Sequence, residues 1–353
     1  MNPYLITDTV TLLTAMESFK DPAVYLVDTF FPQKVPVVNT SKVAVEYRKG
    51  QRQLAPYIVR GARGAEMART TISTKEYTAP MAGARRVLST ADLETRVFGE
   101  QPVYTTMSPQ ERAARLQAED LKDLSGMIVN RRNKFASEIL LTGKVEISGY
   151  ADDGVLAVTD TIDYSFNGIK TPTKIWSDKS AKIYDDLLDT VNEIAEESGE
   201  LPDIMVCGAN VEKYLLANDQ MKDFLMVSNR ANLTIASLTP KYLSPQARYL
   251  GTIPALNLEM YSYLETYWDT ESQKSKRYIP EDSVIVGKAG QGRQIFGAVT
   301  LVDQNLGVQT YASEIVPKYT VDELSQTISL SVYSRCILTP SEIGSWKHIK
   351  TCG

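Results

Sequence analysis

The sequence predicts an α+β protein, in which blocks of strands and helices follow one another along the chain. Three observations predict this class. Apolar residues alternate with period two after residue 35, one amphipathic helical pattern runs from Pro109 to Leu141, and a second helical pattern precedes a short apolar strand, Pro202–Gly208. Of the 353 residues, 43% are hydrophobic, so the chain is long and apolar enough for a sizeable core.

The segment up to about Lys34 is predicted to be an arm with one short helix, which must dock on other parts of the protein to be ordered. Asp8 or Thr9 is suited to cap this helix. Its expected apolar positions are Val10, Leu13, Ala15 and Met16.

A long β-ribbon is predicted next. Val43, Val45 and Tyr47 alternate with less apolar residues, as in a strand, and a second extended stretch covers Arg69–Pro80. The sequence between them, Arg60–Arg69, is rich in Gly and Arg and predicts a flexible, basic tip. Because an isolated two-stranded ribbon is marginally stable in water, we expect this one to pack on something, and on another chain if it projects from its own domain.

A long helix from Pro109 to Leu141 is the strongest local prediction. Ser108 as N-cap, Pro109 as the first helical residue and Glu111 two positions later form a capping box, and Gly143 is the expected stop. Such a helix would be about 50 Å long. One buried face is predicted from the spacing of Leu121, Leu124, Ile128, Phe135 and Ile139.

Arg132 interrupts the apolar face of this helix, four residues after Ile128 and three before Phe135. One interpretation is a contact with an anion or a partner. The favoured interpretation is that its aliphatic stem covers apolar surface while its guanidinium pairs with a carboxylate.

The rest of the chain is predicted to alternate between strands and helices. A hairpin follows Gly143, with its turn at Asp152–Gly154, and a second helix ends at Gly199 with Ile183, Leu187, Val191 and Ile194 on one face. Further predictions are a helix that breaks near Asn218, a polar turn at Ser272–Arg277, two strands around a Gly-rich turn at 288–292, and a C-terminal part that is mostly strand.

The composition excludes several classes of protein. The net charge of -5 argues against counterion-driven binding of nucleic acid by the whole chain. We expect no membrane span, because no run approaches the roughly 20 apolar residues that one requires. The N-terminus does not resemble a signal peptide, and Cys207, Cys336 and Cys352 form no disulfide framework, which favours a reducing cytosol. The single His348 counts against nucleophilic triads and histidine-rich zinc sites.

The remaining motifs are weak, and we expect no catalytic, cofactor-binding or metal-binding residues and no cofactor. Gly290 and Gly292 form a GxG, but Ile295 breaks the dinucleotide-binding pattern, so a tight turn is favoured. Adjacent carboxylates on a helix diverge by about 100° and do not share a ligand. This objection applies to the pairs Asp185–Asp186 and Glu196–Glu197, while Asp152–Asp153 lies in a predicted turn.

The most basic region contains Arg60, Arg63, Arg69, Arg85 and Arg86. It could contact nucleic acid, an acidic patch of a neighbouring subunit, or only solvent. Because no aromatic residues are interleaved for base stacking, a contact with a subunit is favoured over nucleic acid.

Four strings, in this order along the chain, carry a resemblance to a known family: LAPYIVRGARG at 54–64, APMAGARRVLSTADLETRVFGE at 79–100, RRNKFASEILLTGK at 131–144 and YIPEDSVIVG at 278–287. With the length and the long helix, they resemble the tailed-phage major capsid proteins of the lambda-like E type, which have the Hong Kong 97 capsid fold. The resemblance covers essentially the whole chain.

The resemblance implies a division of the chain. Residues 1–34 would be the N-terminal arm, and 35–86 the extended β-hairpin called the E-loop, which lies across a neighbouring subunit. Residues 87–175 and 304–353 would form the P-domain around the spine helix at about 109–141, and 176–303 the α/β A-domain. Arg131 and Arg132 are then expected to hold the end of the spine helix against the P-domain sheet or a neighbour.

The implied function is structural. A major capsid, or head, protein of a bacteriophage self-assembles as hexamers and pentamers into an icosahedral shell around double-stranded DNA, without enzymatic activity. The implied partners are further copies of the chain, a separate scaffolding protein, a decoration protein, the portal, and DNA in weak non-specific contact. The implied location is the virion capsid, after assembly in the host bacterial cytoplasm.

Two alternatives belong to other classes. One is an encapsulin-like shell of a bacterial nanocompartment, which would enclose a protein cargo instead of DNA. The other is an α+β metabolic enzyme, against which the lone histidine and the missing phosphate-binding turns count.

Overall fold

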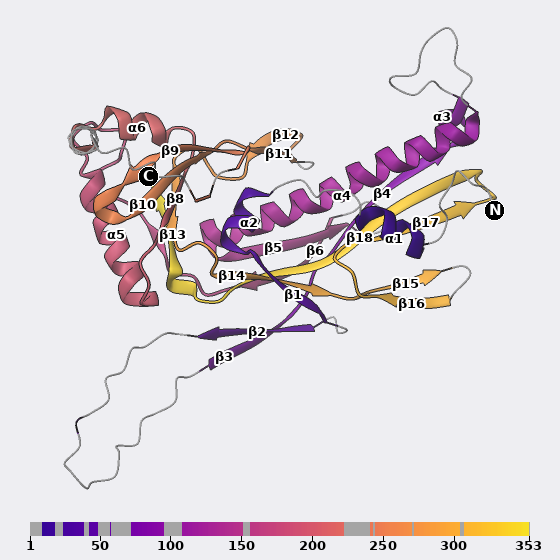
Figure 1. Cartoon of the computed structure of the whole chain (residues 1–353), viewed down its shortest axis with the longest axis horizontal. Coiled ribbons are helices and arrows are strands. Elements are labelled where there is room, and N and C mark those ends of the chain that lie inside the picture. Colours follow the sequence, from indigo (N-terminus) through magenta and orange to yellow (C-terminus); the bar gives the residue numbers. More distant parts are fainter. Residues whose placement is uncertain are drawn as a thin grey trace.

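The computed structural model describes residues 9–17, 24–38, 42–48, 57, 72–94, 108–150, 156–221, 241–242, 244–269, 272–303 and 307–352. Within these ranges, a six-stranded sheet lies at one end of an elongated molecule, and a five-stranded sheet extends from beside it along the long helix α4 (Figure 1). The predicted α+β class is confirmed.

Helix α4 covers Pro109–Thr142, one residue longer than predicted. The capping box is present as predicted: the Ser108 side chain accepts a hydrogen bond from the backbone N–H of Glu111, whose carboxylate accepts one from the backbone N–H of Ser108. Gly143 ends the helix with φ of 66°, the left-handed conformation that favours glycine. A Cβ at this position would lie 2.0 Å from Cβ of Phe166, so glycine is also required by close packing.

A five-stranded sheet packs along α4. Its path runs β1 (Gln33–Val38), β14 (Gly292–Gly297), β18 (Thr327–Pro340) and β17 (Val316–Asp322), and β4 (Met81–Ser89) also pairs with β18. The apolar residues of β18 that face the core belong to the same buried cluster as the predicted face of α4. Of that face, Leu121, Leu124, Ile128 and Ile139 are buried and Phe135 is partly buried.

A six-stranded sheet forms the other end of the molecule. Its order is β7 (Ile169–Lys170), β19 (Trp346–Lys350), β13 (Ser283–Gly287), β8 (Ile204–Cys207), β10 (Leu258–Tyr263) and β9 (Ala247–Ile253). Helices α5 (Ile183–Ser198) and α6 (Val211–Ala217) lie beside it (Figure 1). The predicted apolar face of α5 is buried in a second core with Met205 and Val286, and Gly199 ends this helix as predicted.

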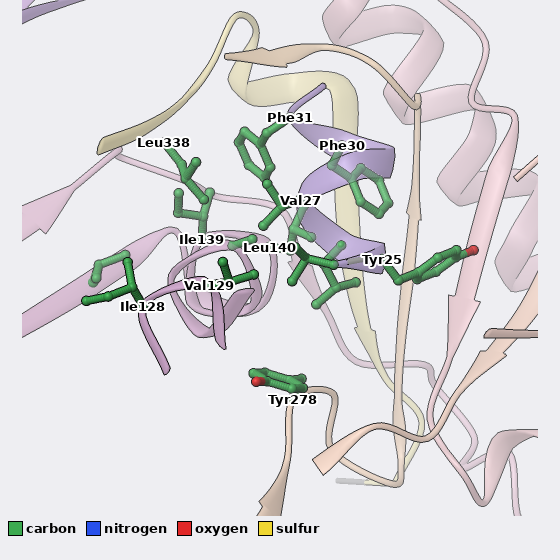
Figure 2. Packing of buried hydrophobic residues seen from close by; sticks show 14 of the residues in the cluster. Tyr25, Val27, Phe30, Phe31, Ile128, Val129, Ile139, Leu140, Tyr278 and Leu338 are labelled. Atoms are coloured by element: carbon green, nitrogen blue, oxygen red, sulfur yellow. The ribbon is translucent and has the colours of Figure 1, made fainter. Parts of the chain in front are cut away.

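Two helices precede the first strand, α1 (Thr9–Glu17) and α2 (Tyr25–Phe30). Helix α1 is confirmed, but its predicted apolar face is rotated: Leu12 is buried and Val10 is exposed. Helix α2 is absent from the sequence prediction. Its side chains insert between α4 and the six-stranded sheet, where Val27 and Phe31 lie near Leu140 and Leu338 (Figure 2).

Four two-stranded ribbons complete the described strands. The predicted long ribbon is β2 (Lys42–Arg48) paired with β3 (Ile72–Thr78), and the predicted hairpin after α4 is β5 (Lys144–Tyr150) with β6 (Leu156–Asp163). The others are β11 (Thr266–Asp269) with β12 (Lys274–Arg277), and β15 (Val299–Asp303) with β16 (Gly307–Tyr311). Short helical segments are α3 (Thr90–Glu94), η1 (Pro254–Leu256) and η2 (Ile343–Ser345).

One local prediction needs correction. The polar segment Ser272–Arg277 is not all turn, because its second part is β12, which pairs with β11. The two predicted strands around the Gly-rich turn are confirmed as β13 and β14, and they belong to different sheets. The chain leaves the six-stranded sheet after β13 and enters the five-stranded sheet with β14.

The predicted domain boundaries at residues 175 and 303 stay predictions, and both sheets are built across them. Strand β14 precedes residue 303, yet it pairs with β18 beside α4. Strand β19 follows residue 304, yet it pairs with β13 and β7 in the six-stranded sheet.

Candidate functional site

The crossing of α4 with the five-stranded sheet is built around Arg132. Its side chain is 7% exposed, with the guanidinium 5.2 Å from the centre of the Phe296 ring. One guanidinium N–H donates to Oε1 of Gln294 at 3.3 Å, and Glu314 lies 3.7 Å away. The favoured interpretation, a stem on apolar surface with a carboxylate partner, matches this geometry. Arg131 is exposed, so of the two arginines it is Arg132 that joins α4 to the sheet.

A chain of polar groups joins α4 to the six-stranded sheet. Asn133, which is fully buried, donates to the hydroxyl of Tyr263 at 2.7 Å, and that hydroxyl donates to the carboxylate of Glu265. Burial raises the pKa of Glu265, and the hydrogen bond from Tyr263 acts in the opposite direction. Arg132 and Asn133 are adjacent, so two successive residues of α4 contact the two sheets.

His348 lies at the C-terminal end of α4 and is 4% exposed. Its Nδ1 is 2.8 Å from the carbonyl oxygen of Leu141, so this nitrogen carries the proton and donates. Nε2 is buried and has no hydrogen-bond partner among the described residues. Burial lowers the pKa of His348 to about 4, against the effect of the hydrogen bond to Leu141. The imidazole is thus a neutral packing group of β19.

The predicted basic region divides into two parts. Arg60, Arg63 and Arg69 lie outside the described residues. Arg86 forms ion pairs with Asp120 at 2.6 Å and with Asp123 at 3.0 Å, and these ion pairs connect β4 to α4. The two carboxylates raise the pKa of the Arg86 guanidinium. Arg85 is exposed on the same strand. Arg86 therefore forms ion pairs within the chain, and the favoured contact of the basic region with another subunit stays a prediction.

The acidic pairs on α5 do not converge on a common point. Asp186 is half-buried and accepts a hydrogen bond from the indole of Trp176 at 2.9 Å. Burial raises the pKa of Asp186, with that hydrogen bond opposing the shift. Glu197 pairs with the buried Lys347 at 2.7 Å and so ties α5 to β19. The pair Asp152–Asp153 lies outside the described residues.

The glycine pair at 290 and 292 serves packing and chain direction. Gly290 has φ of 79°, the left-handed conformation expected of a tight turn. A Cβ on Gly292 would lie 2.1 Å from Cδ1 of Phe31, so glycine lets β14 approach α2 closely. Both positions are thus explained without a nucleotide.

The same ranges also bear on metal sites, membrane-spanning helices and reactive thiols. No group of three or more His, Cys, Asp or Glu side chains there has the arrangement of a metal site. No helix in the described part of the chain is long and apolar enough to cross a membrane. Burial raises the pKa of the Cys336 thiol to about 12 and raises that of Cys207 as well, so both thiols are protonated at neutral pH.

The surface carries several exposed apolar side chains on the ribbons. Val302 and Val308 face each other across β15 and β16 and are both exposed, and Trp268 is exposed on β11. Sequence reasoning missed these positions, because a four- or five-residue strand is too short for its exposed face to be assigned from alternation. Single exposed apolar side chains are normal on protein surfaces, whereas contiguous apolar patches mark contacts with other proteins.

Two solved structures share the fold over nearly the whole chain. A protein assigned as the capsid protein of a prophage of Escherichia coli CFT073 has 17% sequence identity and a TM-score of 0.67, covering 98% of this chain and 99% of its own. A phage-related protein of Bordetella bronchiseptica RB50 has 10% identity and a TM-score of 0.53, covering 98% of this chain and 97% of its own. The expected Hong Kong 97-type capsid fold is therefore confirmed. No curated protein matches the chain in sequence.

The family comparison covers nearly the whole sequence. The model of the family described as phage major capsid protein E matches residues 8–351. That range includes α4, both sheets and all four ribbons. The chain therefore belongs to the phage major capsid protein E family.

Proposed function

We propose that this protein forms hexamers and pentamers that close into an icosahedral shell around double-stranded DNA. Membership of the capsid family makes the chain a structural protein of a phage virion, and this membership is the observation that carries the proposal. The proposal adds the type of oligomer, the closed shell and its content. Neither a catalytic activity nor a cofactor is part of it.

The proposed division of labour follows the order of elements. The segment 1–34 acts as the arm, 35–86 as the E-loop, 87–175 with 304–353 as the P-domain, and 176–303 as the A-domain. The pairing of β14 with β18, and of β19 with β13, supports one change to these boundaries. Strand β14 is proposed to belong to the P-domain and β19 to the A-domain. The spine of the P-domain is α4.

The β2–β3 ribbon is proposed to reach a neighbouring subunit. The two strands pair in antiparallel register, with Lys42 opposite Thr78 at one end and Arg48 opposite Ile72 at the other. They extend away from the rest of the molecule (Figure 1). A two-stranded ribbon gains little stability alone, so contact with a neighbour would complete its packing. Basic residues at 60, 63 and 69 are proposed to meet acidic groups of that neighbour.

The proposed partners are other copies of the chain, a separate scaffolding protein, a decoration protein, the portal, and DNA in weak non-specific contact. The negative net charge supports weak contact, because strong binding of DNA relies on many Lys and Arg contacts with phosphates. Assembly is proposed to take place in the host bacterial cytoplasm.

Electron microscopy tests the proposal. The purified protein should be imaged alone and after co-expression with the genes that neighbour its own. Rings of five and six subunits, or closed shells, are the expected result. Uniform monomers in both preparations would contradict self-assembly. Nuclease-protected DNA in particles from phage-producing cells supports the phage shell, whereas an enclosed enzyme would support a nanocompartment.

A further inference from the structure

Five tyrosines form a continuous row of rings beside the six-stranded sheet. Tyr267 and Tyr278 have their ring centres 5.0 Å apart, and the centre of the Tyr263 ring lies 6.2 Å from that of Tyr278. Tyr25, which comes from α2, follows Tyr263 at 5.4 Å, and Tyr261 follows Tyr25 at 6.0 Å. We call these five residues the tyrosine chain. Every step in it is a direct contact between aromatic rings.

The tyrosine chain has a buried middle and leads to the surface on both sides. Tyr267 on β11 is half-buried, whereas the other four members are at most 2% exposed. Beyond Tyr261 the row of rings divides, to Tyr249 on β9 at 5.5 Å and to Tyr242 at 6.4 Å between ring centres. Both of these rings are half-buried. Aromatic contacts thus run from the β11–β12 ribbon through the interior to the edge strand β9.

Three tyrosines along this path donate their hydroxyl proton to a carboxylate. These pairs are Tyr263 with Glu265, Tyr261 with Glu259 at 2.7 Å, and Tyr242 with Asp203 at 3.1 Å. The hydroxyl of Tyr25, by contrast, is buried and has no hydrogen-bond partner among the described residues. Packing alone does not require these hydroxyls, because a phenyl ring fills nearly the same space and buries no polar group. The phenol–carboxylate pairs therefore point to chemistry of the phenol.

A phenol that donates to a carboxylate can lose an electron and a proton together. The electron leaves the ring for an oxidant, and the proton moves along the hydrogen bond to the carboxylate, which leaves a neutral tyrosyl radical beside a carboxylic acid. When the next tyrosine supplies an electron, the proton returns and the first tyrosine is restored. Tyr25 has no acceptor for its proton. Its ring is therefore a bridge between two stopping points, Tyr263 and Tyr261.

We propose that the tyrosine chain conducts one-electron oxidising equivalents from the β11–β12 ribbon to β9, with Glu265 and Glu259 as the proton acceptors of its two stopping points. The oxidant is a strong one-electron acceptor in solution, such as the carbonate radical. It takes an electron from the half-buried Tyr267, whose proton passes to water. The tyrosyl radical that reaches Tyr242 or Tyr249 takes a hydrogen atom, an electron with a proton, from a soluble thiol, and this restores the phenol.

A light-driven oxidant at one end and a radical trap at the other end test this conduction. Ser275→Cys is labelled with a ruthenium polypyridyl complex in a Cys336→Ala, Cys352→Ala background, since Ser275 is exposed on β12 beside β11. Tyr249 is replaced by aminotyrosine, which is oxidised more easily than tyrosine. A flash in the presence of a cobalt(III) ammine, which accepts the first electron, produces ruthenium(III). Electron paramagnetic resonance then measures the aminotyrosyl radical.

The aminotyrosyl signal should form in this labelled chain, and more slowly in heavy water, because a proton moves with each electron. Tyr263→Phe and Tyr261→Phe should each lose most of the signal. Glu265→Gln should lose it as well, since the amide keeps the size of the side chain but is a far weaker base. Tyr25→Phe should keep most of it, because the bridging ring stays. Tyr319→Phe on β17 is the matched control and should change nothing, since this half-buried tyrosine lies outside the chain.

The absence of an aminotyrosyl signal from the labelled chain would overturn the proposal. An undiminished signal in Tyr263→Phe and Tyr261→Phe would do so too, because the oxidising equivalents would then use another route. Thermal melting checks that each variant folds. Should a Phe variant unfold, Glu265→Gln still decides, and a full signal there would refute a carboxylate as the proton acceptor. Conduction takes place within a single copy, so it stands or falls independently of the shell function.

Discussion

At Arg132 a buried charge joins helix α4 to the five-stranded sheet. The guanidinium has an aromatic face, an amide and a carboxylate around it, but its Nε and Nη2 have no hydrogen-bond partner among the described residues. Such a charge costs free energy to bury, so its net contribution comes as much from the packing of its stem as from its ion pair.

This balance gives a prediction for substitutions. Arg132→Ala should lower the free energy of unfolding by about 2–4 kcal/mol, because it opens a cavity and leaves Gln294 without its donor. Arg132→Met keeps most of the stem and should cost clearly less. Chemical denaturation of the unassembled protein measures both. Arg131→Ala is the control, since that neighbouring side chain is exposed. Equal stability of the Ala variants at 131 and 132 would refute the role given to Arg132.

His348 makes stability depend on pH in a defined window. Its pKa in the folded chain is about 4, below the usual 6.5, so between these values the unfolded chain binds the additional proton. The stabilising contribution is complete above pH 6.5 and is lost as the pH falls from 6.5 to 4. Over that window it amounts to about 3 kcal/mol.

The replacement His348→Asn isolates this effect. The amide can donate to the carbonyl of Leu141 but does not titrate. The free energy of unfolding of the natural sequence should therefore fall more steeply between pH 6.5 and 4 than that of the variant. Denaturant titrations at several pH values measure both slopes. Parallel slopes would mean that the histidine is as easily protonated in the folded chain as in the unfolded one.

At the residue scale, prediction from sequence succeeded where a pattern had one physical meaning. An arginine within an apolar helical face has to cover that face with its stem, and Arg132 does. The role of His348 was not predictable, because a histidine near the end of the sequence gives no sign that its strand is paired on both sides. Arg86 appeared to belong to a basic patch, but the carboxylates that pair with it lie on a helix over 30 positions later.

At the scale of single elements, α4 and α5 were predicted well because amphipathic spacing, a cap and a terminal glycine agree. Helix α2 was missed because its six residues are too few for periodicity, and its N-cap residue, Val24, has no side chain that can cap a helix. Burial stabilises it instead: Tyr25, Leu26, Val27 and Phe30 are all buried, mostly against distant parts of the chain. The face of α1 was misassigned since its own sequence has apolar residues on several sides.

Two glycines of α4 give a matched pair of substitutions. Gly126 lies inside the helix with open space where a Cβ would be, so Gly126→Ala should raise the free energy of unfolding by about 0.5–1 kcal/mol through helix propensity. Gly143 has a positive φ, and a Cβ there would overlap Phe166. Gly143→Ala should therefore lower the free energy of unfolding by more than about 2 kcal/mol. Thermal melting distinguishes the two signs. A gain of stability at position 143 would contradict the described end of α4.

At the scale of the whole molecule, neither sheet is built from one continuous segment. Strand β1 near the N-terminus pairs with β14, and β4 pairs with β18 across more than 200 positions of sequence. Sequence reasoning identified most of these strands, yet it assigned them to domains by contiguous segments. Pairing between distant strands depends on tertiary packing, and no local pattern encodes it. For this reason the sequence does not tell that β13 and β14 belong to different sheets.

The C-terminal strand should therefore be essential to the six-stranded sheet. β19 lies between β7 and β13, the Trp346 ring stacks on Phe166 at 4.9 Å, and Ile349 belongs to the second core. Deleting residues 346–353 would leave one side of β13 unpaired and remove several buried side chains. The shortened chain should lose its cooperative thermal transition and become sensitive to protease between residues 169 and 287, while α4 and the five-stranded sheet keep part of their protection.

Deleting only Cys352 and Gly353 is the matched control for this truncation. It leaves β19 complete, together with Thr351, whose backbone N–H and hydroxyl both donate to the carbonyl of Asp282. This variant should melt within about 2 °C of the full chain, because the half-buried Cys352 loses only a weak thiol contact with the Tyr214 hydroxyl at 3.7 Å, which costs less than about 0.5 kcal/mol. If the longer deletion also melted at that temperature, the six-stranded sheet would have to be stable without β19. The A-domain would then be a product of residues 176–303 alone, as the contiguous division supposes.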